Sequence, residues 1–85
     1  MARVRWLPCI AAVEWHSGGR ALERPVALRL GEEQVVVSVE DAWVAGAGNG
    51  GAPVERVFVV RDPAGRRWRV RVRGSGPVRV DREDR

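Results

Sequence analysis

Apolar and basic residues alternate strictly from Arg67 to Arg73, within the stretch RRWRVRVR that begins at Arg66. Successive side chains of a β-strand point to opposite faces, so this stretch is predicted to be a strand with two different faces. One face would be apolar: Trp68, Val70 and Val72. The other would carry what we call the arginine row: Arg67, Arg69, Arg71 and Arg73. Neighbours in this row would stand about 6.6 Å apart, because a strand rises about 3.3 Å per residue.

A turn pattern directly before this strand predicts a hairpin. In the sequence Asp62-Pro63-Ala64-Gly65, Asp opens the turn, Pro fixes φ at the first corner and Gly takes the left-handed position. The preceding residues, Val57 to Val60, are all apolar, which indicates burial on both faces of a strand. We therefore expect an antiparallel hairpin from about Val57 to Arg73.

The N-terminal third predicts further short strands. Residues 3–6 alternate between basic and apolar side chains until Pro8 interrupts the pattern. Residues 10–15 fit either a strand or a single helical turn, because so short a segment has no decisive period. A second alternating run begins at Pro25, with three apolar residues on one face: Val26, Leu28 and Leu30.

Residues 34–44 form the longest strand candidate of the chain. Asp41 falls on the apolar parity of this run, so we expect a bend or bulge near Glu40-Asp41. A glycine-rich loop at residues 45–53 follows, and a short last strand is predicted at residues 78–80.

Short β-branched segments separated by turn residues are typical of an all-β domain. We expect five or six antiparallel strands in a small, partly open β-barrel of the SH3-like kind, formed by residues 1–80 as a single domain. A curved sheet that dimerises is the alternative. Residues 81–85 are all charged and are expected to form a frayed tail.

Length and hydropathy bound the class of protein. The 85 residues allow one domain with a small core. No apolar run approaches the roughly 20 residues of a membrane span, and basic residues near the N-terminus interrupt any signal-peptide core. The sequence therefore predicts a cytoplasmic protein with no membrane partner.

The content of cysteine and histidine argues against an enzyme. Cys9 is the only cysteine and His16 the only histidine, so neither an intramolecular disulfide nor a zinc site with the usual sulfur and nitrogen ligands is expected. These two residues are also the one conceivable nucleophile–base pair, and nothing in their spacing requires them to meet. We expect no catalytic site, no metal and no cofactor.

All 15 basic residues are arginine, and the net charge is +4. A GC-rich genome explains this composition without any function, so the placement of the arginines matters more than their number. The arginine row could contact the phosphates of a nucleic acid or another polyanion, because guanidinium groups bind phosphate well. The alternative is a solvated outer face that pairs with carboxylates and protects a sheet edge, which explains the same pattern. The carboxylates available for such pairing are Glu32, Glu33, Glu40 and Glu55.

The chain has four tryptophans. Trp6 and Trp68 fall on apolar parities and are expected in the core. Trp43 and Trp15 lie at segment ends, where an exposed indole could stack on a base. Packing in the core or at its rim is the alternative for both.

Three stretches carry a resemblance to a family: GGRALERPVALRLG (Gly18 to Gly31), VSVEDAW (Val37 to Trp43), and a DxxGRRW hairpin that starts at Asp62. With these motifs the chain resembles a family of small, uncharacterised bacterial β-proteins. The resemblance covers roughly residues 13–73 and implies a compact β-domain. The family has no assigned activity, so the resemblance assigns no functional residue.

Two functional hypotheses follow. The first is a noncatalytic β-barrel module that binds an anionic partner, with nucleic acid as the first candidate. Its site residues would be Arg67, Arg69, Arg71, Arg73 and Trp43. The second is a protein–protein interaction or homo-oligomeric assembly module, in which another subunit completes an apolar face or an open edge.

Overall fold

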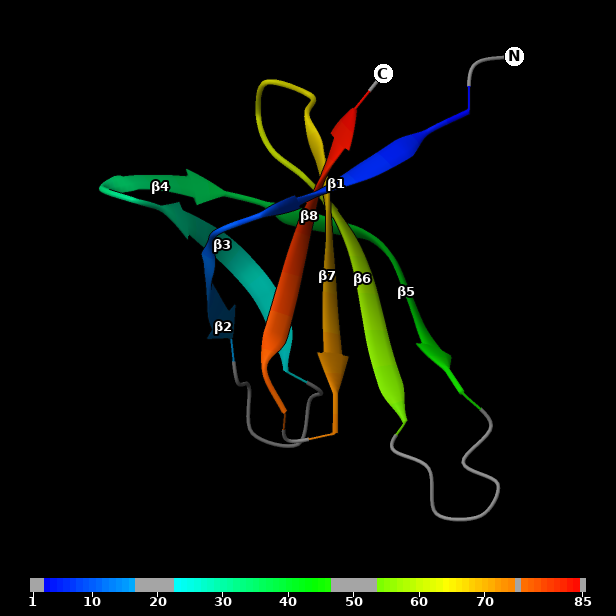
Figure 1. Cartoon of the computed structure of the whole chain (residues 1–85). Coiled ribbons are helices and arrows are strands. Elements are labelled where there is room, and N and C mark those ends of the chain that lie inside the picture. Colours follow the sequence, from blue (N-terminus) through cyan, green and yellow to red (C-terminus); the bar gives the residue numbers. More distant parts are fainter. Residues whose placement is uncertain (1–2, 17–22, 47–53, 75, 85) are drawn as a thin grey trace.

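The computed structural model describes residues 3–16, 23–46, 54–74 and 76–84, which form eight strands in two antiparallel sheets (Figure 1). The large sheet has the order β1-β8-β7-β6-β5, and the small sheet has the order β2-β3-β4. The strands are β1 (Arg5–Cys9), β2 (Ala12–His16), β3 (Arg24–Leu30), β4 (Glu33–Val36), β5 (Ser38–Ala45), β6 (Glu55–Arg61), β7 (Arg67–Arg73) and β8 (Val78–Asp84).

The all-β prediction is confirmed, whereas the number of strands exceeds the five or six expected. The two sheets are not closed into a barrel, so the SH3-like barrel stays a prediction. Within the described residues, no helix is long and apolar enough to cross a membrane.

The predicted hairpin is confirmed as β6 and β7, joined by the turn Asp62–Gly65. Gly65 has φ +86°, in the left-handed region, and its N–H donates to the Asp62 carbonyl at 3.0 Å. The buried Asp62 carboxylate accepts hydrogen bonds from the backbone N–H and from Nε of Arg66, both at 2.9 Å. Burial raises the pKa of Asp62, but the hydrogen bonds and the charge of Arg66 outweigh it, so the pKa is lowered overall.

The strand expected at residues 34–44 is divided between the two sheets. The chain leaves the small sheet after Val36, and Val37 is buried in the core, where its N–H donates to the Val26 carbonyl at 3.0 Å. The expected irregularity near Glu40-Asp41 is confirmed by a register shift between Val39 and Asp41. The glycine-rich loop lies outside the described residues from residue 47 to residue 53.

The first and last strands of the structure extend further than expected. β1 continues through Pro8, which an edge strand tolerates because one of its sides has no ladder partner. Residues 10–15, left open between strand and helix, contribute to β2. The expected frayed tail is wrong for residues 81–84, which belong to β8 because β1 and β7 pair with it on either side.

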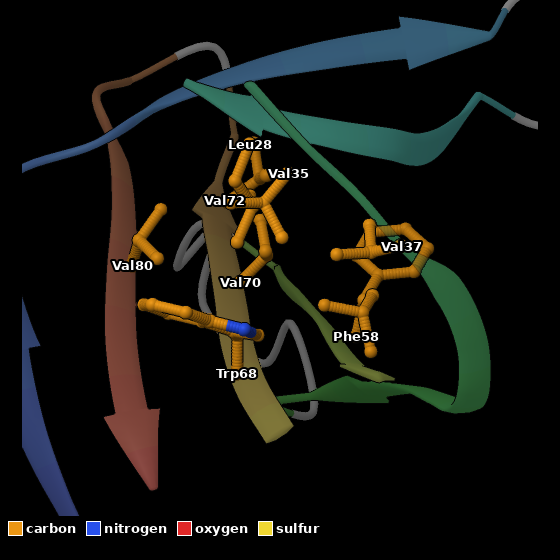
Figure 2. Close-up of a cluster of buried hydrophobic side chains, with 9 residues drawn as sticks. Leu28, Val35, Val37, Phe58, Trp68, Val70, Val72 and Val80 are labelled. Carbon is orange, nitrogen blue, oxygen red and sulfur yellow. The ribbon is translucent and has the colours of Figure 1, made fainter. Parts of the chain in front are cut away.

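The core lies where the small sheet packs against the large one (Figure 2). The apolar face of β7 is confirmed, since Trp68, Val70 and Val72 are all buried. They meet Leu28 of β3, which is fully buried. The residues of this cluster are Leu28, Val35, Val37, Phe58, Val60, Trp68, Val70, Val72 and Val80.

Candidate functional site on the arginine face

The four arginines of the row alternate with buried residues along β7 and therefore share the outer face of the large sheet, opposite the core. Val57 and Val59 of β6 lie on this same outer face, opposite Arg71 and Arg69. Both valines are nevertheless buried, as expected for the continuous apolar run of β6. Long aliphatic stems of arginine can cover such residues while the guanidinium remains in water.

Arg67 is held by two carboxylates. Its Nε lies 3.1 Å from Oε2 of Glu40, and its Nη1 lies 2.8 Å from Oε2 of Glu83. Glu40 also pairs with Arg61 of β6. Arg67 is therefore part of a network that links β5, β6, β7 and β8 across the sheet.

Arg69 and Arg71 share the carboxylate of Asp81 on β8. Oδ2 of Asp81 lies 2.9 Å from Nη2 of Arg69 and 3.1 Å from Nη2 of Arg71. Asp81 is only 3% exposed. The guanidinium of Arg69 also lies over the ring of Trp6, with its carbon 5.1 Å from the centroid. Trp6 is thus half-buried on the outer face and not in the core as expected, because it pairs with Glu83 and not with a core residue.

The sequence identified only one of the carboxylates that neutralise the row. Glu40 is among the four candidate carboxylates, whereas Asp81 and Glu83 fall in the segment expected to be a frayed tail. A signal was present, because residues 79, 81 and 83 share one parity of a strand that continues beyond Val80.

Positive charge is in excess at the other end of the row. Arg79 of β8 lies directly opposite Arg71 in the ladder, and Arg73 lies opposite Glu55. Neither Arg73 nor Arg79 has an ion pair within the described part of the chain. The row is therefore neutralised at Arg67 and Arg69 and cationic near Arg71, Arg73 and Arg79.

Trp43 is brought to the same face as the arginines. It pairs with Val57, which in turn pairs with Arg71, so two inter-strand spacings, about 10 Å, separate Trp43 from Arg71. Trp43 is 44% exposed. Trp15 instead packs edge-to-face on Phe58, with centroids 5.7 Å apart, which places it at the rim of the core and away from this face.

A second feature is β5, the last strand of the large sheet, whose outer side has no ladder partner among the described residues. Val44 is 64% exposed beside Trp43. A small apolar hollow of about 150 Å³ adjoins this edge, and its lining residues are Glu23, Ala42, Trp43, Val44, Arg56 and Phe58.

The candidate pair Cys9 and His16 is divided between the two sheets. Cys9 is the last residue of β1 in the large sheet, whereas His16 is the last residue of β2 in the small sheet, about 13 Å along that strand from Ala12. No group of three or more potential metal ligands occurs among residues 3–16, 23–46, 54–74 and 76–84.

Comparison with protein-family models, with curated proteins and with solved structures found no match to this chain. The resemblance to the bacterial β-protein family stays a prediction. The interpretation of the site therefore rests on its geometry.

Proposed function

We propose that this protein is a noncatalytic assembly module in which the open edge of β5 pairs with β5 of a second copy. The observation that carries the proposal is the apolar stretch Ala42–Ala45 on the last strand of the large sheet, of which Ala42, Trp43 and Val44 are exposed. An exposed edge strand offers unpaired N–H and C=O groups to another strand.

The other sheet edges have the features that prevent such pairing. β1 contains Arg5 and Pro8, β2 contains Glu14 beside a register shift, and β4 has only four residues and begins with Glu33-Gln34. Charges, proline, bulges and short length are the usual protections of an edge. On β5, Glu40, Asp41 and the bulge protect the first half of the strand, and the segment Ala42–Ala45 has none of these protections.

The side chains of β5 are compatible with antiparallel pairing of two copies of this strand centred on Trp43. The two Trp43 side chains would face each other, and Ala42 would lie opposite Val44 of the second copy. Asp41 would lie opposite Ala45, so no carboxylates of like charge would meet. This pairing would extend the large sheet and would not close it into an SH3-like barrel.

Sedimentation velocity over a range of concentrations tests the proposal. We expect a reversible dimer for the natural chain and a shift to monomer for Val44→Lys, because a charge at this position would be buried against the second copy. Val36→Lys is the matched control, since Val36 is 62% exposed at the end of β4. A monomer at the highest attainable concentration, or equal dissociation by both variants, would overturn the proposal.

Binding of nucleic acid is the second candidate, and the excess of arginine beside an exposed Trp43 favours it. The carboxylates count against Arg67 and Arg69 as phosphate ligands, because an approaching phosphate must compete with Glu40, Glu83 and Asp81. Arg73 and Arg79 would carry the contacts instead.

Fluorescence anisotropy with labelled single-stranded RNA tests this second candidate. We expect Arg73→Gln to lower the slope of log affinity against log salt by about 0.7, the effect of one lost phosphate contact. Arg29→Gln, on the exposed part of β3, makes the same change in net charge in the other sheet. Equal effects of the two variants would indicate general charge attraction and no site on this face.

A further inference from the structure

A hollow of about 330 Å³ lies where β1 separates from β8, and it is independent of the β5 edge. The last ladder pair of β1 is Cys9 with Val80, so Val78 and Arg79 of β8 extend past the end of β1. The residues that line the hollow are Pro8, Cys9, Ile10, Ala11, Arg71, Val78, Arg79, Val80 and Asp81. Arg71 and Arg79, both on the outer face, therefore line the same hollow.

The charges around this hollow are not balanced. Arg71 and Arg79 are directly opposite in the ladder, where side chains lie about 5 Å apart at Cβ and like charges repel. The one carboxylate in the lining, Asp81, is already shared by Arg69 and Arg71. The two guanidinium groups and the one carboxylate of the lining leave one positive charge in excess, and Arg69, which lies outside the lining, also engages that carboxylate.

The hydrogen-bond donors of the two arginines are also not fully used. Nε of Arg71 is buried and has no acceptor within the described residues. Arg79 is exposed and has no ion pair there. Guanidinium groups bind tetrahedral oxyanions through paired N–H donors, with stronger bonds than neutral donors make.

We propose that this hollow binds a phosphate group, held between Arg79 and Arg71. An oxyanion neutralises the excess positive charge of the site and reduces the repulsion between the two guanidinium groups. The shared chemistry is that of a phosphate, whether free or at the end of a small phosphorylated molecule. Asp81 stays paired with Arg69 and keeps Arg71 in place beside the ligand.

A titration with inorganic phosphate at constant ionic strength, followed by ¹H–¹⁵N NMR, tests the proposal. We expect saturable shifts of Arg71 Nε–H and of the backbone amides of residues 78–81. Arg79→Gln should weaken binding about tenfold or more, because a charge-assisted donor pair is lost. Arg29→Gln, with the same change in charge on β3, should bind phosphate as the natural chain does.

The arms of the experiment separate the possible outcomes. Saturation by a nucleoside monophosphate at lower concentration than by free phosphate would identify a phosphorylated small molecule as the ligand class, and the reverse order would identify free phosphate. Shifts that grow linearly with phosphate, or equal weakening by Arg79→Gln and Arg29→Gln, would overturn the proposal. The result does not depend on self-association, because Val44→Lys can be titrated in the same way.

Discussion

The substitution Asp81→Asn tests whether the arginine row is structural. Asp81 is 3% exposed, and its carboxylate lies within 3.1 Å of Nη2 of both Arg69 and Arg71. Asparagine keeps the size and one acceptor oxygen but removes the charge that holds the two arginines together. Removing one partner of a fully buried ion pair costs about 3–5 kcal/mol.

The cost is lower here because both arginines stay partly in water. The Arg69 and Arg71 side chains are 25% and 29% exposed, so the guanidinium groups keep part of their hydration after the change. We expect a loss of about 2 kcal/mol in the free energy of unfolding. For a domain of this size that loss corresponds to a decrease in Tm of roughly 8–16 °C.

Urea denaturation, followed by tryptophan fluorescence, measures this loss. The midpoint should fall while the slope with urea stays constant, because the surface exposed on unfolding does not change. Asp41→Asn is the matched control: Asp41 is exposed and accepts a hydrogen bond only from the N–H of Ala42, at 2.9 Å, among the described residues. A loss for Asp81→Asn no larger than that for Asp41→Asn would refute the argument and would leave Arg69 and Arg71 free for a polyanion.

Three further predictions concern the fold. Leu28→Ala should destabilise the protein by about 2–5 kcal/mol in urea denaturation, because the fully buried Leu28 joins the small sheet to the core. Val36→Ala, at an exposed site, should have little effect. Gly65→Ala should lower the free energy of unfolding by about 1–2 kcal/mol, because Gly65 has φ +86°, although nothing lies within 4 Å of an added Cβ. An unchanged Tm of this variant would contradict the expected backbone strain. Folding lowers the pKa of Asp62, so its contribution to stability is present above the unfolded pKa of about 3.9 and is lost as the pH falls through the folded value. Asp62→Asn should therefore reduce the fall in the free energy of unfolding at acid pH. An unchanged pH dependence would exclude this role of Asp62.

The parts of the fold predicted correctly are those that depend on local sequence. The hairpin of β6 and β7 follows from the turn at Asp62–Gly65 and from the alternation after it, and both are short-range properties. The division of residues 34–44 between two sheets could not be predicted, because it depends on the burial of Val37 against residues far along the chain. Likewise, the charged segment after Val80 is a strand because β7 pairs with it as far as Arg82 and β1, from the other end of the chain, pairs with it as far as Asp84.

The same distinction between local and long-range determinants applies to the candidate site. The arginine row could be predicted from its period of two, but its neutralisation depends on the long-range ladder that places Asp81 opposite Arg69. The same ladder places Arg79 opposite Arg71 and so produces the excess of positive charge.

The two proposed sites lie at different strands of the large sheet, and the distance between them predicts that they act independently. The phosphate hollow lies at β8 and the pairing edge at β5, three inter-strand spacings apart, which amounts to roughly 14 Å. Surface charges separated by more than about 10 Å are largely screened at moderate salt, so neither site should alter the other. Arg79→Gln should therefore leave the dimer unchanged, and Val44→Lys should leave phosphate binding unchanged. Loss of both properties in either variant would mean that a single interface, and not two independent ones, uses the arginines and the edge together.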